Sequence, residues 1–132
     1  MNDQSLSIGQ LEDLPGIEMP GLDGVTKQIV FGPGKNWDDY VMRCFTLEGQ
    51  AQVPLHNHEW PHYVITLRGQ ARLDIDNQSR DLSPLSFAYV PPHSRHSFTK
   101  TSHDPFVFLC IVPKEGDVPD RKSTRLNSSH YS

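Results

Sequence analysis

Four histidines in this chain have types and spacing that suit a metal site. His56, His58 and His62 fall within the heptapeptide HNHEWPH, and His96 follows in PPHSRH. Neutral imidazole nitrogens bind divalent transition metals, and residues at i and i+2 of an extended strand point to the same side of it. His62 is an even number of residues from His56 and His58. Its side chain can therefore point to the same side as theirs if the chain stays extended or turns tightly in between. The spacing therefore predicts a nearly complete metal site on these four residues.

The segments that must position the histidines have the pattern of short β-strands. Turn-forming pairs such as Arg68-Gly69, Asp76-Asn77 and Pro91-Pro92 separate them, and no window shows a sustained helical period of apolar residues. Many short strands with prolines at their ends indicate an all-β sandwich or small barrel. The expected strands are Val25–Phe31, Tyr40–Leu47, Ala51–His56, His62–Leu67, Ala71–Asp76, Ser86–Val90, His96–Thr99 and Phe106–Val112.

Composition excludes several classes of function. The chain of 132 residues has 12 Lys and Arg against 16 Asp and Glu, a net charge of −4, and it lacks the clustered basic residues of a nucleic-acid interface. Its longest apolar stretch, Phe106–Val112, is too short to cross a membrane. The first residues lack the apolar core of a secretory signal, so we expect a cytoplasmic protein in which Cys44 and Cys110 are reduced thiols.

The chain divides into three parts. Residues 1–24 are rich in Pro and Gly and are predicted to form an irregular lead-in, and residues 25–119 form one domain. Residues 120–132 contain DRKSTRLNSSH, which resembles the translation of a common sequencing adapter. This tail is therefore expected to be non-native, as in an assembled environmental or transcript sequence, and is excluded from the fold prediction.

The two histidine segments resemble the two sequence motifs of the cupin superfamily. The stretch from Gly49 through HNHEWPH to Gly69 is similar to the first motif, in which HxH precedes an acidic residue and a glycine lies at each end. PPHSRH is similar to the second motif, PxGxxH. The resemblance covers about residues 25–115. It implies an all-β cupin double-stranded β-helix, which is a jelly-roll barrel.

Some positions depart from the cupin pattern. His62 stands where most cupins have Glu, and Leu85 and His93 stand where the second motif has glycines. Because the glycines mostly serve turns, their loss should not change the fold. The Glu-to-His change matters for chemistry, because four neutral imidazoles leave the full charge of a divalent ion and no carboxylate among its ligands. An octahedral ion held in this way keeps open positions for water, dioxygen, peroxide or a chelating substrate.

A narrower resemblance is to small single-domain cupins with four histidine ligands, which are typically manganese proteins. The matching stretches are YVMR, HEWPH and FLCIVPKEG. Members of this subgroup form dimers, and some cleave alkene double bonds oxidatively. The resemblance implies one divalent metal per chain, manganese first and iron or copper as alternatives. It further implies a homodimeric oxidoreductase that uses dioxygen or peroxide on a small organic substrate.

Arg43 and Cys110 are the candidate catalytic residues, because the family places both near the metal cavity. The alternatives are an arginine on a solvated strand face and a thiol in the core. His93 and His103 lie in predicted loops, where exposure to solvent is more common than metal binding.

Three aromatic residues are the candidate substrate-binding residues. Phe98 and Phe108 belong to predicted strands of the barrel core, and in a barrel that core also lines the ligand cavity. Trp60 lies between two predicted metal ligands. It is either a turn residue anchored on the surface or part of the rim, where an indole would stack on a ring of the substrate.

Other functions fit the same motifs. A redox-neutral lyase or isomerase would use the metal only as a Lewis acid, but it needs a positioned base, and the replacement of Glu by His62 weakens that case. Copper-dependent oxidative cleavage of a polysaccharide is less compatible with the missing export signal. A non-catalytic binder of a sugar or small molecule is the third alternative, because one barrel supports many functions. No nucleic-acid or membrane partner is expected.

Overall fold

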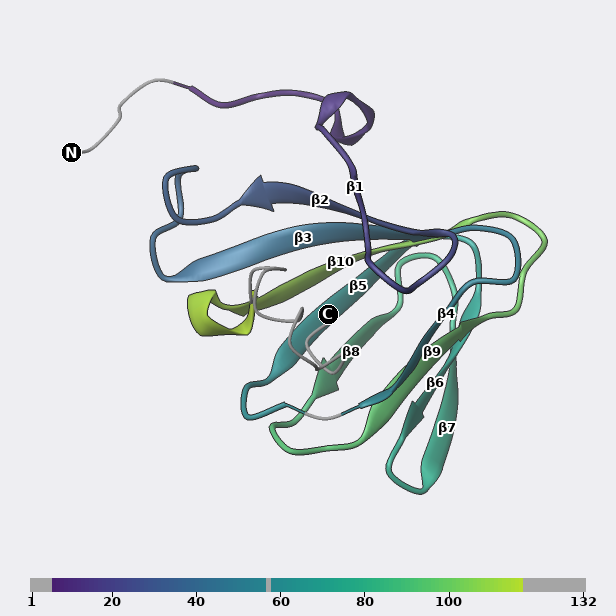
Figure 1. Cartoon of the computed structure of the whole chain (residues 1–132). Coiled ribbons are helices and arrows are strands. Elements are labelled where there is room, and N and C mark those ends of the chain that lie inside the picture. Colours follow the sequence, from purple (N-terminus) through teal and green to yellow (C-terminus); the bar gives the residue numbers. More distant parts are fainter. Residues whose placement is uncertain (1–5, 57, 118–132) are drawn as a thin grey trace.

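The structure, a computed structural model, describes residues 6–56 and 58–117, and the side chains of residues 54–56 lie outside that description. The described chain consists of short antiparallel strands and two 3₁₀ turns (Figure 1). No helix in the described ranges is long and apolar enough to cross a membrane. The elements are η1 (Leu11–Asp13), β1 (Ile17–Glu18), β2 (Val25–Phe31), β3 (Tyr40–Leu47), β4 (Gln52–His56), β5 (His62–Arg68), β6 (Ala71–Ile75), β7 (Gln78–Leu82), β8 (Phe87–Val90), β9 (His96–Lys100), β10 (Phe106–Pro113) and η2 (Lys114–Gly116).

The strands form two facing sheets. The larger sheet has the order β1-β2-β3-β10-β5-β8 and the smaller one the order β4-β9-β6-β7. Every pairing is antiparallel. The four-stranded sheet faces the six-stranded sheet. The two sheets are close together along one edge and farther apart at the other (Figure 1). This all-β arrangement is that of a jelly-roll domain, as the sequence predicts.

Alternating burial along the strands defines the space between the sheets. β5 and β10 alternate strictly between buried and less buried positions along most of their length, because side chains of a strand point to opposite faces. The inward set from both sheets includes the stacked rings of Phe98 and Phe108, whose centroids are 4.8 Å apart. His62, His96, Arg43 and Cys110 are buried in the same space between the sheets. The site is therefore built into the core of the barrel.

The lead-in wraps around the edge of the larger sheet. The amide of Gln28, on the outer face of β2, donates hydrogen bonds to the carbonyls of Leu11 and Leu14 at 2.7 and 3.0 Å. β1 then adds to the edge of β2, and Met19 and Leu22 pack against the core from the inside. Residues 11–24 are thus packed against the domain, and η1 and β1 are their only regular elements.

The predicted strands agree with the observed ones to within one residue at each end. β7 was not predicted, because four of its five residues are exposed and polar and it pairs only at the edge of the smaller sheet. It is formed by the turn at Asp76-Asn77, where Asp76 has a φ of 52°. The proposed adapter tail, residues 120–132, lies outside the described residues.

Candidate metal centre and adjoining cavity

Three of the four predicted ligands meet between the sheets. His62 begins β5 and His96 begins β9, so they come from opposite sheets, and their ring centroids are 4.9 Å apart. The ring of His58 lies 5.4 Å from that of His62 and 6.0 Å from that of His96. All three side chains are buried, with exposed fractions of 8%, 3% and 2% in chain order. Histidines gathered in this way, away from water, suit a metal better than a solvated surface.

The hydrogen bond of His96 defines which of its nitrogens faces the site. Its Nδ1 lies 3.1 Å from the carbonyl oxygen of Ser94. Since a carbonyl only accepts, Nδ1 carries the proton and Nε2 keeps a lone pair. Burial lowers the pKa of His96 below its ordinary value, with the Ser94 carbonyl partly opposing this effect. A neutral imidazole with Nε2 unprotonated is the form that binds a metal, so this residue fits the predicted role.

His58 differs from the sequence prediction in its local structure. The i, i+2 spacing predicts that His58 shares an extended strand with His56, whereas β4 ends at His56 and His58 lies in the loop before β5. The backbone N–H of His93 donates to the carbonyl of His58 at 2.6 Å. The loops of the two histidine motifs are therefore joined directly, and this contact, rather than strand parity, positions His58.

His56 lies opposite His96 in the β4–β9 register, and its side chain lies outside the described residues. Among the side chains that the structure describes, no group of three or more His, Cys, Asp or Glu is placed so that it could hold a metal ion. The four-histidine donor set therefore stays a prediction from the motifs.

Arg43 and Cys110 lie directly behind His62. The guanidinium Nη2 of Arg43 donates to the sulfur of Cys110 at 3.1 Å, and that sulfur lies 3.3 Å from Nδ1 of His62. β3 and β10 are neighbours in which the two residues pair in register. Burial raises the pKa of the Cys110 thiol, and the charge and hydrogen bond of Arg43 partly offset that rise. Arg43 is therefore not on a solvated strand face. Cys110 is not an isolated core thiol, because it contacts Arg43 and His62.

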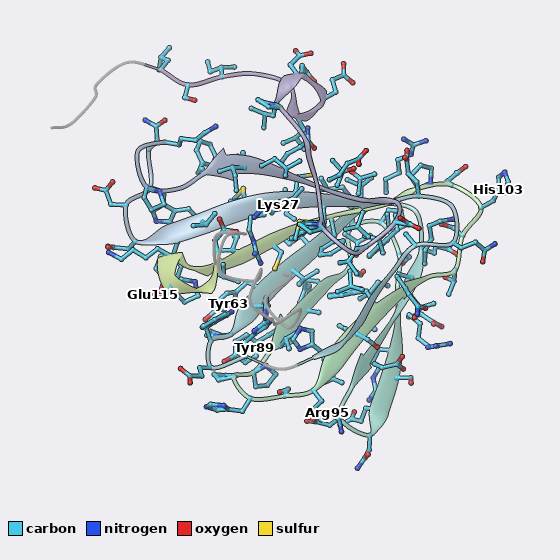
Figure 2. All side chains as sticks on the ribbon, viewed as in Figure 1. Lys27, Tyr63, Tyr89, Arg95, His103 and Glu115 are labelled. Carbon is cyan, nitrogen blue, oxygen red and sulfur yellow. The ribbon has the colours of Figure 1, made fainter. Side chains whose placement is uncertain are left out.

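The chain of polar contacts continues to two residues that the sequence analysis missed. Asp117 accepts a hydrogen bond from Nη1 of Arg43 at 3.3 Å and one from Nζ of Lys27 at 3.0 Å. Lys27 is buried and points into the barrel (Figure 2). Its position between Val25 and Ile29, with inward parity on an apolar strand, is the sequence feature that could have identified it. Asp117 follows η2, outside any strand, so no alternating pattern in the sequence could have identified it.

An apolar cavity adjoins the histidines. Its volume is small, about 20 Å³ for the centre of a water-sized sphere, which is room for one or two water molecules. None of the described residues that line it is Asp or Glu. The lining residues are Met19, Leu22, Val25, Arg43, Phe45, Val53, His62, His96, Phe98, Phe108 and Cys110.

The predicted aromatic residues divide between two places. Phe98 and Phe108 line the cavity. Trp60 is placed behind the site, with its ring stacked on that of His58 at 4.9 Å and 11°, and it packs so closely on Gly116 that a Cβ there would lie 2.7 Å from the indole. Trp60 thus contacts a predicted ligand rather than the cavity.

The two loop histidines are exposed, as predicted. His103 projects from the loop between β9 and β10, far from Lys27 and the interior (Figure 2). His93 contributes its backbone, not its ring, to the site.

Comparison with known proteins agrees with this architecture. The chain is 27% identical over 96 residues to a 1-methylthio-D-xylulose 5-phosphate methylsulfurylase from Rhodospirillum rubrum, and it spans 60% of that relative's length. A cupin 2 domain-containing protein from Halorhodospira halophila is 31% identical, with a TM-score of 0.64 over 69% of this chain and 65% of the other. A polyketide cyclase from Streptomyces resistomycificus has the same fold, with a TM-score of 0.75, coverage of 83% and 80%, and 20% identity. Residues 43–112, more than half of the chain, match the family described as Cupin domain. With its two motif loops meeting inside a jelly roll, this chain belongs to the cupin family.

Proposed function

We propose that this cupin is a metal-dependent oxidoreductase, an oxygenase that uses dioxygen or peroxide on a small organic substrate. The observation that carries the proposal is the buried histidine cluster that opens on an apolar cavity. His96 offers Nε2 to this cluster, since its Nδ1 proton is engaged by Ser94. The proposed ligands are His56, His58, His62 and His96.

We infer a single divalent ion per chain, and the resemblance to four-histidine cupins puts manganese first, with iron or copper as alternatives. When bound, such an ion would supply Lewis acidity and, if redox-active, electrons for dioxygen or peroxide. When Nε2 of His62 is used as a ligand, Nδ1 carries the proton and donates to the sulfur of Cys110. Cys110, itself held by Arg43, then fixes the orientation of that ring. Trp60 holds the ring of His58 by stacking.

The cavity supports oxygenase chemistry on a non-polar group. Its wall is dominated by aliphatic and aromatic side chains, including Phe98 and Phe108. Its apolar chemistry suits an alkene or aromatic group and excludes bulk water, while its volume of about 20 Å³ admits a small neutral oxidant. The described lining contains no carboxylate to act as a general base, which a lyase or isomerase would need.

A redox-neutral reaction is the second candidate. The observation that favours it is the 27% identical relative from Rhodospirillum rubrum, whose name describes transfer of a methylsulfur group and not oxygenation. In that case the same centre would act only as a Lewis acid towards the substrate.

Metal content of the purified protein tests the ligand assignment. We expect about one manganese, iron or copper per chain, and His96→Ala should weaken metal binding at least about 100-fold, because it removes a direct ligand. His103→Ala is the matched control, since its ring is exposed and distant. Equal metal content in His96→Ala and the wild type, with both folded by circular dichroism, would rule the assignment out.

Reconstitution with different metals separates the two functions. An oxygenase consumes dioxygen or peroxide with an alkene substrate when loaded with manganese, iron or copper, and it is inactive with zinc. Turnover that is equal with zinc and without an oxidant would favour the redox-neutral reaction. Binding of small molecules without turnover under any of these metals would leave only a binding role.

A further inference from the structure

We propose that Lys27 and Arg43 form a binding site for an anionic group of the substrate, a carboxylate or a phosphate ester, and that Asp117 occupies this site until the substrate replaces it. This inference rests on the proposed function, because it defines the class of substrate that the same barrel takes. The anion site adjoins the histidine cluster through Arg43, and anion binding can be tested without metal.

The two cations are buried where strand positions are normally apolar. Arg43 has an exposed fraction of 0% and Lys27 of 8%, and they occupy inward positions of the neighbouring strands β2 and β3. Both cations contact the Asp117 carboxylate, at 3.0 and 3.3 Å, so an anion already lies between them. Burial of such charges is costly unless they bind an anion.

Asp117 is poorly anchored in comparison with its partners. It follows the single turn η2, and its backbone N–H makes a long hydrogen bond of 3.3 Å to the carbonyl of Lys114. Its side chain is 20% exposed, whereas that of Arg43 is fully buried. A carboxylate at the end of one 3₁₀ turn can move outward without disturbing a strand, because no sheet hydrogen bond depends on it.

A route for a ligand leads to this carboxylate. Asp117 forms part of the wall of a second, more open cavity of about 370 Å³, a volume in the range of small-molecule sites. The other walls are mainly apolar and include Ile29 and Val41 of β2 and β3. Asp117 thus lies between this outer cavity and Arg43, which faces the inner cavity beside the histidines.

Arg43 links the anion site to the histidine cluster. Its Nη1 contacts Asp117 while its Nη2 contacts Cys110, which in turn contacts His62. An acid group bound in place of the Asp117 carboxylate would engage the guanidinium from the outer side. The remainder of the substrate would then extend towards the apolar inner cavity. The geometry favours a molecule with an acid group at one end and a non-polar reactive group at the other.

Competition by Asp117 makes the proposal measurable. An internal carboxylate lowers the apparent affinity for an external anion by the fraction of molecules in which the site is open. Asp117→Asn keeps the size and removes the charge, so we expect the protein to bind inorganic phosphate or acetate about tenfold more tightly or better. Lys27→Met in the same background should abolish this gain. Asp81→Asn, an equal charge change at an exposed position of β7, should leave affinity unchanged.

The titrations use the full chain, stripped of metal and dialysed free of chelator, with heat of binding and backbone NMR shifts as readouts. Phosphate favoured over acetate indicates a phosphate ester, and the reverse a carboxylate; either supports the proposal. No gain in Asp117→Asn, or an equal gain in Asp81→Asn, would overturn it.

If Asp117→Asn does not fold, the same titrations of the wild type test the anion site. Shifts of Asp117 and Lys27 that saturate with phosphate or acetate support the site, and their absence overturns it. Because no metal is present, a negative result here leaves the proposed metal chemistry intact, and a failed metal test leaves the anion site intact.

Discussion

At the scale of single residues, the interior of this barrel is unusual for its polar content. Arg43, Cys110 and His62 make consecutive contacts of 3.1 and 3.3 Å in a space otherwise lined by apolar groups. Groups of this kind are costly to bury alone, but each has a partner in the described structure. Family resemblance places Arg43 and Cys110 at the site, whereas the contacts of Lys27 and Asp117 are known only from the structure.

The second cysteine provides a prediction about pH. Cys44 is buried on β3, and burial raises the pKa of its thiol above the ordinary value of 9.0. Above about pH 9 the thiol ionises in the unfolded chain but stays protonated in the folded chain. The free energy of unfolding should therefore fall as pH rises from about 9 towards the higher folded pKa. Below about pH 9 the thiol is protonated in both states, and the stabilising contribution of Cys44 is fully present.

Chemical denaturation between pH 7 and 10.5 measures this effect. The loss of stability caused by Cys44→Ala should shrink as pH rises, because the variant lacks the titrating group. Val112→Ala truncates another fully buried side chain without a titrating group, so its loss should stay constant. Parallel curves for the wild type and Cys44→Ala would contradict the prediction.

At the scale of elements, the loops place the site more than the strands do. His62 and His96 are first residues of strands, but His58 is held by the loop contact with His93. His93 adopts a φ of 69°, and Leu85 before β8 adopts a φ of 74°. These are the two positions where the cupin motif has glycines, so the turns persist although the residues differ. Non-glycine residues in this left-handed region are strained.

Leu85→Gly should therefore stabilise the protein. The side chain of Leu85 is 83% exposed, so little packing is lost when it is removed. Relief of the left-handed strain, about 1–2 kcal/mol, exceeds the entropy that glycine adds to the unfolded chain, and we expect a net gain of about 0.5–1 kcal/mol.

Leu85→Ala is the control at the same position. It removes the exposed side chain but keeps Cβ, so it should bring no gain. Both variants are compared with the wild type by urea denaturation. A stability of Leu85→Gly at or below that of Leu85→Ala would show that the backbone strain is not the relevant cost.

At the scale of the whole molecule, the outer face of the larger sheet carries an exposed apolar patch. We define it as Tyr63 and Ile65 of β5 with Phe87 and Tyr89 of β8. Phe87 is 83% exposed, and the rings of Tyr63 and Tyr89 lie 5.2 Å apart on the same side of the molecule (Figure 2). Clustered exposed apolar side chains of this kind typically mark an interface. The patch is a natural location for the homodimer that the family resemblance predicts.

Analytical ultracentrifugation tests this prediction. Phe87→Asp introduces a charge at the most exposed residue of the patch and should convert a dimer into a monomer, because a buried unpaired charge is unfavourable at an interface. Gln78→Asp, at an exposed position of β7 in the other sheet, is the matched control and should remain dimeric. A dimer that persists in Phe87→Asp would place the interface elsewhere, and a monomeric wild type would contradict the homodimer itself.

Local spacing was sufficient to predict the all-β class, eight of the strands, the cupin resemblance and three histidines that the structure brings together. These features depend on alternation, turn residues and motif spacing, which are properties of neighbouring residues. Tertiary packing decided the rest. The position of His58, the wrapping of residues 11–24 around the sheet edge, and the contacts of Asp117 with Lys27 and Arg43 join segments far apart in the chain. Their energies arise only when the sheets close on each other, so no local pattern encodes them.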